Sequence, residues 1–204
     1  EGPSSFSAAS HLLVYTVQRY DQKDTMRLKL MTSYLGADGW GEPQEVPFNN
    51  ANYNVGHPSI SKDGSTLYFA SDMPGGFGGV DLYKVERSPE GFWGEPMNLG
   101  SEINTDKNDV FPFVHEDGLL FFSSVGRCGM GGLDVFVTFL SATETTVEPL
   151  EAEINSEGDD FSFILSSDQK TGYFTSNRAG GQGLDDIYNF SNAMSFSSSG
   201  ALKG

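Results

Sequence analysis

The sequence predicts an all-β protein built as a β-propeller, and three observations lead to this prediction. Similar segments recur at nearly constant intervals along the 204 residues. Within each repeat, short runs of β-branched and aromatic residues are separated by Gly, Asp and Pro turn signals, and no stretch has a convincing helical period. Four-stranded sheets of about 50 residues that stack around an axis are the blades of a propeller.

Two independent markers define the repeat. A glycine-rich segment occurs as "GGFGGVDLY" at 75–83, as "CGMGGLDVF" at 128–136 and as "GGQGLDDIY" at 180–188. The sequence "WGEP" occurs at 40–43 and again at 93–96, with the same interval of 53 residues. Because a nucleotide site is built once per domain, a segment copied at a fixed interval indicates architecture.

One unit reads as a meander of four strands. "HPSIS" at 57–61 alternates and is followed by the turn "KDG", and the β-branched and aromatic "STLYFAS" at 65–71 follows. "VDLYKVE" at 80–86 alternates again, and "FWGEPMNL" at 92–99 predicts an outer strand in which Pro96 is tolerated at the sheet edge. The second strand of each unit is apolar on both faces, which requires both faces of the sheet to be covered.

The repeat sets the expected domain organisation. We expect a propeller over residues 1–190, with blades at about 4–52, 53–106, 107–157 and 158–190, followed by a linker at 191–204. The first unit has "RYDQKDTMRL" where glycines are expected. We favour a partial propeller whose earlier blades lie upstream, because an open arc leaves apolar blade faces uncovered.

Composition narrows the classes of partner. Twenty-eight acidic and twelve basic residues give a formal net charge of −16, which repels nucleic acid and anionic lipid surfaces. The longest apolar runs, such as "LLFF" at 119–122, are far shorter than the roughly 20 residues that span a bilayer, so we expect no direct membrane insertion. Cys128 is the only cysteine, so no disulfide forms within the chain.

The repeats resemble those of a known family. The segments 59–83, 116–136 and 168–188 resemble the WD-repeat-like propeller repeats, related to those of TolB, in OmpA-family envelope proteins of Bacteroidetes. The run 54–86 looks especially like the propeller of PorE-type components of the type IX secretion system. This resemblance implies a periplasmic, outer-membrane-associated protein whose partners are other envelope or secretion-system proteins. It also implies that residues 191–204 lead into a regulatory-like β-sandwich, and that peptidoglycan is bound only through a domain outside this sequence.

The glycine segment itself has three interpretations. A dinucleotide fingerprint needs a helix after the motif and a third glycine, and here a strand follows and Asp replaces that glycine. The structural interpretation is that the glycines supply positive φ and the Asp accepts hydrogen bonds from the loop amides. A third interpretation is a cation such as calcium, held by Asp81 or by Asp185 and Asp186. The motif residues are Gly76, Gly78 and Asp81, Gly129, Gly131 and Asp134, and Gly181, Gly183 and Asp186.

Few other residues suggest chemistry. His11, His57 and His115 occupy different repeat positions, so we expect no convergence on a metal. We predict no cofactor, and we regard His57, Arg127 and Arg178 as candidate contacts with a partner protein.

The functional prediction follows from the recurrence of every notable residue. We expect a non-enzymatic interaction or scaffold module of a cell-envelope protein, linked to type IX secretion or to anchoring of the outer membrane to peptidoglycan. One alternative is a carbohydrate-active propeller enzyme, a hydrolase or lyase, that uses the carboxylates of Asp109, Asp159 or Asp160. The other alternative is a propeller that senses a cation or a small ligand.

Overall fold

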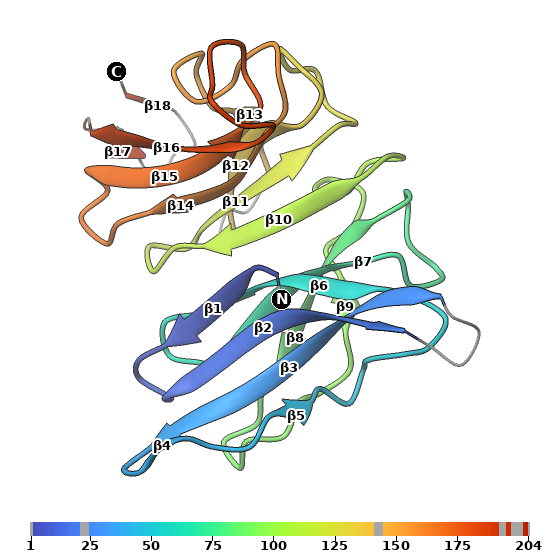
Figure 1. Ribbon diagram of the computed structural model, residues 1–204. Helices are drawn as coiled ribbons and strands as arrows, with labels where there is room; N and C mark the ends of the chain where they lie inside the picture. Colours follow the sequence, from blue (N-terminus) through green and yellow to red (C-terminus); the bar gives the residue numbers. More distant parts are fainter. Residues whose placement is uncertain (1, 21–24, 141–144, 192–194, 197–201, 204) are drawn as a thin grey trace.

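The computed structural model describes residues 2–20, 25–140, 145–191, 195–196 and 202–203. The described residues contain strands and turns but no helix. Four antiparallel sheets follow one another along the chain and are arranged around a common centre (Figure 1). The predicted all-β propeller with four blades is therefore confirmed.

Each blade is an antiparallel meander whose strands pair in sequence order, except that β5 of blade 1 pairs with β3. Blade 1 contains β1 (Ser4–Ser7), β2 (Leu12–Tyr20), β3 (Met26–Gly36), β4 (Gly39–Trp40) and β5 (Gln44–Glu45). Blade 2 contains β6 (Val55–Ile60), β7 (Thr66–Ser71), β8 (Asp81–Glu86) and β9 (Met97–Asn98). Blade 3 contains β10 (Asp109–Val114), β11 (Leu119–Ser124), β12 (Asp134–Phe139) and β13 (Val147–Pro149). Blade 4 contains β14 (Asp160–Leu165), β15 (Thr171–Ser176) and β16 (Asp186–Ser191).

The turn between the first two strands of blades 2, 3 and 4 requires a left-handed backbone. Gly64 has φ of 75° and Gly118 has φ of 81° at this turn. Glycine adopts such angles without a steric penalty, which explains its presence in two of the three turns. Gln169 adopts φ of 57° at the matching position of blade 4. The turn geometry is therefore retained where the glycine is not.

The hydrophobic core is divided among the blade interfaces. One cluster joins blades 1 and 2 through residues such as Leu12 and Phe69, which are fully buried. A second cluster joins blades 2 and 3 around Phe122, and a third joins blades 3 and 4 around Phe121. Because neighbouring residues of one strand point to opposite faces, β11 contributes to two clusters at once. This explains why the second strands of blades 2 and 3 are apolar on both faces.

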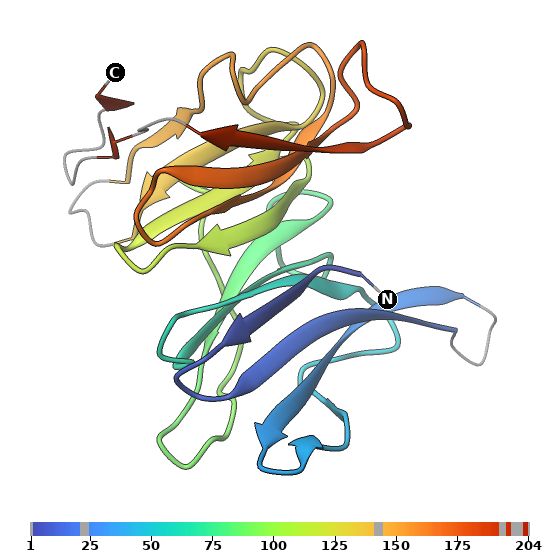
Figure 2. The same cartoon turned by 60° about the vertical axis from the view of Figure 1, so that its left-hand side comes forward.

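The four blades form an open arc. Among the described strands, every contact between blades joins consecutive blades, and blade 4 does not contact blade 1. Figures 1 and 2 both place the blue sheet of blade 1 and the orange sheet of blade 4 at opposite ends of the arc. The consequence is visible in β15, where burial alternates with exposure instead of being continuous as in β11.

Residues beyond blade 4 are only partly described. The short strands β17 (Ser195–Phe196) and β18 (Leu202–Lys203) pair with each other. Residues 192–194, 197–201 and 204 lie outside the described residues. The linker at 191–204 that leads into a β-sandwich therefore stays a prediction. The part of the chain that the structure describes contains no helix with the length and apolar character needed to span a membrane.

Candidate functional site

The Asp of each glycine segment fixes its own loop. The carboxylate of Asp81 accepts hydrogen bonds from the amides of Phe77 at 2.6 Å and Gly78 at 3.0 Å. Asp134 and Asp186 bind the matching amides of their own loops in the same way. Because Asp81 and Asp134 are each 1% exposed, these bonds satisfy charges that water does not reach.

The glycines of the motif allow their loop to approach neighbouring backbone closely. The expectation that these glycines have positive φ is wrong. Positive φ occurs at Gly75 and Gly180, which precede the motif. A Cβ at Gly131 would overlap the carbonyl oxygen of Gly158, which precedes blade 4, and a Cβ at Gly78 would overlap that of Lys107, which precedes blade 3. The loop of one blade therefore lies directly on the segment that leads into the next blade.

Hydrogen bonds repeat at each of these blade junctions. The amide of Leu133 donates to Asp159 Oδ1 at 2.8 Å, and the amide of Asp160 donates to the carbonyl of Leu133 at 2.6 Å. In the preceding interface, Val80 donates to Asn108 Oδ1 at 3.0 Å. Asp159 and its equivalents are thus bonded within the structure, where they hold successive blades in register.

The buried aspartates at the start of β10 and β14 are also structural. Asp109 and Asp160 are 0% exposed, and each accepts hydrogen bonds from the amide and hydroxyl of the residue four positions earlier, Thr105 and Ser156. Asp160 also pairs with the Arg178 guanidinium at 2.7 Å. These carboxylates therefore face the protein interior and make internal hydrogen bonds. The carbohydrate-active alternative requires the same carboxylates to be accessible to a substrate.

Each of the two arginines lies over aromatic rings of its own blade and donates to carbonyl oxygens of the segment that precedes this blade. Arg178 lies over the rings of Phe174 and Tyr188, at 4.8 Å and 5.0 Å from the ring centroids. Arg127 donates to the carbonyl oxygens of Glu102 and Ile103, and burial lowers the pKa of its guanidinium. Both side chains are half-buried, and their role as partner contacts stays a prediction.

Replacing Asp160 tests this internal network. We expect Asp160→Ala to lower the free energy of unfolding by about 2 kcal/mol, because it removes charge-assisted hydrogen bonds and leaves Arg178 partly buried without its partner. Urea denaturation of the purified protein measures this value. A matched control is Asp106→Ala, an exposed acid in the lead-in to blade 3, which should change stability by less than about 0.5 kcal/mol. Equal losses for both variants would contradict the structural role.

His115 and His57 have different surroundings. His115 is 4% exposed and its Nε2 lies 3.1 Å from the carbonyl oxygen of Ser166. His57 stacks on Phe111 with ring centroids 3.9 Å apart. Within the described residues, no cluster of three or more His, Cys, Asp or Glu side chains is arranged to hold a metal. The interpretation of Asp81, or of Asp185 with Asp186, as a cation site stays a prediction.

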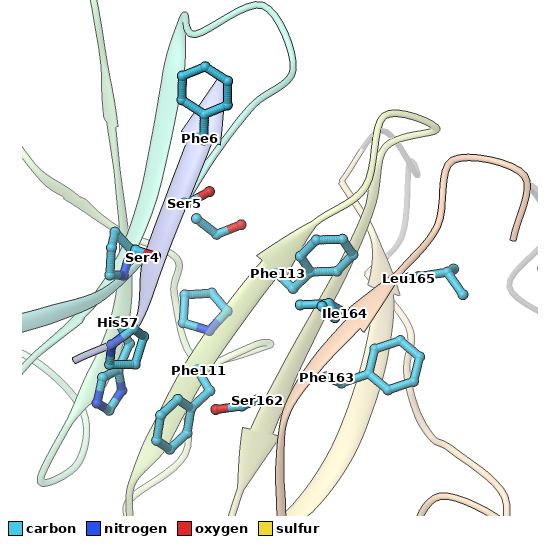
Figure 3. Close-up of a pocket in the computed structure, with 14 residues that line it drawn as sticks. Ser4, Ser5, Phe6, His57, Phe111, Phe113, Ser162, Phe163, Ile164 and Leu165 are labelled. Atoms are coloured by element: carbon cyan, nitrogen blue, oxygen red, sulfur yellow. The ribbon is translucent and has the colours of Figure 1, made fainter. Parts of the chain in front are cut away.

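A pocket lies where the first strands of all four blades meet, and we call it the axial pocket. Its volume is about 330 Å³, and it is lined by residues 3–6, 57–59, 111–113 and 162–165 (Figure 3). The lining is mainly aromatic, aliphatic, prolyl and hydroxyl. Figure 3 shows the labelled residues on strands of different blades around this space, with the side chains of Phe163 and Leu165 directed away from it. Among the described residues that line the pocket, none carries a carboxylate or an amine, despite the strongly acidic composition of the chain.

The backbone around the axial pocket is strained in a repeated manner. His57, Phe111 and Ser162 have φ of 51°, 51° and 54°, and each lies at a bulge in the first strand of its blade. Residues other than glycine rarely adopt such angles, which cost about 1–3 kcal/mol each. The sequence identified His57 as a candidate partner contact but did not single out Phe111 or Ser162. Pro58 and Pro112 follow His57 and Phe111 directly and are a signal that could have identified Phe111, whereas Ser162 is followed by Phe163 and has no such signal.

His57 makes the stability of the protein depend on pH. Burial lowers the pKa of His57 from 6.5 to about 4, and its Nδ1 has no hydrogen-bond partner. Because the unfolded chain binds this proton near pH 6.5 and the folded chain only near pH 4, acid favours unfolding between these values. The contribution of the neutral imidazole is complete above pH 6.5 and is lost as pH falls toward 4.

Between pH 6.5 and pH 4, we expect His57 alone to lower the free energy of unfolding by roughly 3 kcal/mol. Chemical denaturation at pH 7.5 and at pH 4 of the natural chain and of His57→Phe isolates this contribution, because Phe preserves the stack on Phe111 and cannot titrate. The difference between the two proteins should change with pH in this window. A constant difference would show that His57 is not held neutral.

Comparisons with known proteins show the fold. No protein-family model matches the chain, and no curated protein matches its sequence. TolB from Acinetobacter baumannii is similar in structure, with a TM-score of 0.62 and 14% identity over 93% of this chain. This chain spans only 40% of that TolB chain.

Two further structures share the architecture. The β-propeller domain of the trilobed protease from Pyrococcus furiosus, described as having an open velcro topology, aligns with a TM-score of 0.51 and 12% identity, over 94% of this chain and 54% of that chain. An α-L-arabinofuranosidase from Lactobacillus brevis aligns with a TM-score of 0.57 and 11% identity, over 94% of this chain and 70% of that chain. All three likenesses fall at identities that show the fold alone.

The arabinofuranosidase overturns one expectation from the sequence. We predicted that the chain is not an enzyme because every recurring residue has an architectural role. An enzyme with the same fold over nearly the whole of this chain shows that this reasoning is wrong, since a propeller of repeated sheets also occurs in glycosidases. The fold is similar to that of TolB and to that of an enzyme, and it shows that this chain is a β-propeller.

Proposed function

We propose that the chain is a protein-interaction module whose axial pocket receives an extended, largely apolar segment of a partner protein. The proposal rests on the pocket itself, which is lined by residues of all four blades, has no charged side chain among its described lining residues and is bordered by strained backbone at repeat-equivalent positions. Concave sites lined by apolar and aromatic side chains with a few polar groups are typical binding sites.

Hydrogen bonds between blades hold the walls of this pocket. The hydroxyl of Ser5 accepts from the amide of Ile60 at 3.0 Å, and that of Ser59 accepts from the amide of Val114 at 2.8 Å. These bonds fix the spacing of β1, β6 and β10. A pocket whose walls are already held loses little conformational entropy when a ligand enters, which favours binding.

The partner should carry basic residues beside its apolar segment. The formal net charge of −16 produces a negative potential around the neutral pocket, and such a potential attracts a cationic protein and raises the rate of association. We further propose that this partner is another protein of a bacterial cell envelope. The sequence resemblance to envelope propellers and the structural similarity to TolB support a periplasmic, outer-membrane-associated location and a link to type IX secretion or to peptidoglycan anchoring.

An array of extended 15-residue peptides tests the proposed pocket. We expect binding to apolar peptides flanked by Lys or Arg, and weaker binding at 0.5 M salt than at 0.05 M salt, because salt screens the attraction. Ser4→Trp fills the pocket from an exposed rim position and should weaken binding at least tenfold. Ser101→Trp, at an exposed serine outside the pocket, is the matched control. Equal binding by both variants would contradict the axial site.

A further inference from the structure

A groove lies between blades 2 and 3, where their glycine segments meet the lead-in to blade 3, and we call it the junction groove. Its volume is about 560 Å³. It is lined by Phe77 of the blade 2 loop, by residues 101, 102 and 104–106 of the lead-in, and by residues 126–128 of the blade 3 loop. Blades 2 and 3 each contact another blade on both sides, so the groove belongs to the interior of the arc and to neither end of it. None of its lining residues lines the axial pocket.

Hydrogen bonds hold the walls of the junction groove in place. The guanidinium of Arg127 donates to the carbonyl oxygens of Glu102 and Ile103. The amide and the hydroxyl of Thr105 donate to Asp109 Oδ2 at 2.6 Å and 2.9 Å. Walls that are held before a ligand arrives lose little conformational entropy when it binds.

Two carboxylates of the junction groove are unpaired. Glu102 and Asp106 are exposed, and within the described residues neither carboxylate makes an ion pair or a hydrogen bond. Lys107 follows Asp106 in the chain but does not line the groove. Arg127 is the only cation among the described lining residues, and its guanidinium interacts with the buried carboxylate of Asp109. The groove therefore offers two negative charges to a cationic ligand.

Phe77 adds an aromatic ring to the same groove. The residue is 52% exposed, and its backbone amide is bonded to Asp81, so the ring stands on a loop that is fixed by other contacts. An aromatic ring together with carboxylates favours a guanidinium, which stacks on rings and forms bidentate hydrogen bonds with carboxylates. An ammonium group is more strongly hydrated and lacks this planar geometry. The lining therefore favours arginine over lysine.

The next blade junction shows how a guanidinium is accommodated. Arg178 lies over aromatic rings of blade 4 and pairs with Asp160 Oδ1 at 2.7 Å. The repeat equivalent of Asp160 is Asp109, which is 0% exposed and whose Oδ1 has no hydrogen-bond partner. The junction between blades 2 and 3 thus retains acceptor capacity that a guanidinium fills at the junction between blades 3 and 4.

From these observations we propose that the junction groove binds an arginine side chain carried on a loop of a partner protein. The guanidinium pairs with Glu102 and Asp106 and lies over the ring of Phe77. The formal net charge of −16 attracts such a basic partner. The groove is open and does not enclose its ligand as small-molecule sites do, which suits a side chain presented by a protein surface. This site goes beyond the proposed function, which concerns the axial pocket.

Cys128 permits a direct test, because it lines the groove and is the only cysteine of the chain. The probes are a capped peptide with the sequence cysteine-glycine-arginine-leucine, supplied as its disulfide dimer, and the same peptide with citrulline, the neutral isostere, in place of arginine. Each peptide exchanges onto Cys128 in the presence of 2-mercaptoethanol, and intact-mass spectrometry measures the modified fraction. The arginine peptide should remain attached at about tenfold more 2-mercaptoethanol than the citrulline peptide. Salt at 0.5 M should reduce this preference.

Substitutions in the groove test the roles of its residues. The double substitution Glu102→Gln and Asp106→Asn should reduce the preference for arginine to about twofold or less, because it removes both unpaired charges. Glu95→Gln, at an exposed acid outside the groove, is the matched control and should leave the preference unchanged. Ser4→Trp should also leave it unchanged, so the result is independent of the axial pocket. Circular dichroism shows whether each variant is folded.

A relocated thiol measures the effect of overall charge. Cys128→Ser combined with Ala37→Cys places the only thiol at an exposed turn of blade 1, beside Asp38 and outside the groove. There we expect a preference for the arginine peptide of less than about threefold. Equal attachment of the two peptides to the natural chain overturns the proposal. So does a preference at Cys128 that survives the double substitution, or one that the relocated thiol reproduces, because it then reports only the net charge of the chain.

Discussion

Substitution of Gly131 by Ala is expected to lower the free energy of unfolding by about 4 kcal/mol. The added Cβ overlaps the carbonyl oxygen of Gly158 and lies 2.6 Å from the carbonyl oxygen of Ser156. Overpacking typically costs about 1–3 kcal/mol, and the cost is higher here because the obstructing atoms are backbone rather than a movable side chain. Equilibrium denaturation in urea measures this loss of stability. The expected loss is a large part of the free energy of unfolding of a typical domain.

Gly183 provides the matched control, since it occupies the same repeat position in blade 4. A Cβ there meets nothing closer than the carbonyl oxygen of Asp185 at 3.3 Å, because no following blade lies against it. Gly183→Ala should therefore cost less than about 1 kcal/mol. Similar losses for Gly131→Ala and Gly183→Ala would show that the glycines serve their own loops and not the contact between blades.

The second large effect is expected for Phe121→Ala, which should cost about 4 kcal/mol. Phe121 is 0% exposed in the cluster between blades 3 and 4, and its ring lies 4.7 Å from that of Phe163, measured between centroids. Removal of a buried phenyl ring loses transfer free energy and leaves a cavity, for a total of about 3–5 kcal/mol.

The corresponding residue of blade 4 again supplies the control. Tyr173 is 51% exposed, so Tyr173→Ala should cost less than about 1 kcal/mol in the monomer. Thermal denaturation at low protein concentration compares the two variants under the same conditions. A loss for Tyr173→Ala that matches the loss for Phe121→Ala would mean that blade 4 is covered in solution by part of the same molecule.

The repeat made much of the fold predictable. The spacing of the Asp residues at 81, 134 and 186 set the register of the blades, and the structure places all three at the start of the third strand of a blade. Period-two patterns and turn signals identified the strands because local chain geometry determines both. The loop function of the Asp was also deducible, since a buried carboxylate needs donors and the loop amides are the nearest donors.

The candidate site was less predictable because its features depend on contacts between blades. Nothing local to Gly131 shows that the backbone of Gly158 lies against it, so sequence reasoning attributed the glycine to a turn. The axial pocket is lined by Phe111 and Ser162 together with residues from the two other blades. In the sequence, the repeated Pro58 and Pro112 are the one feature that relates these positions to each other. His57 looked like a surface contact, whereas burial against Phe111 explains its low pKa.

Amide hydrogen exchange in dilute solution tests the nesting of successive blades most directly. The amides of Val80 and Leu133 are each bonded to a side chain of the following blade, Asn108 and Asp159, whereas Asp185 occupies the same repeat position with no following blade in the described chain. The account predicts slow exchange at Val80 and Leu133 and fast exchange at Asp185. Equal exchange rates at the three positions would contradict it.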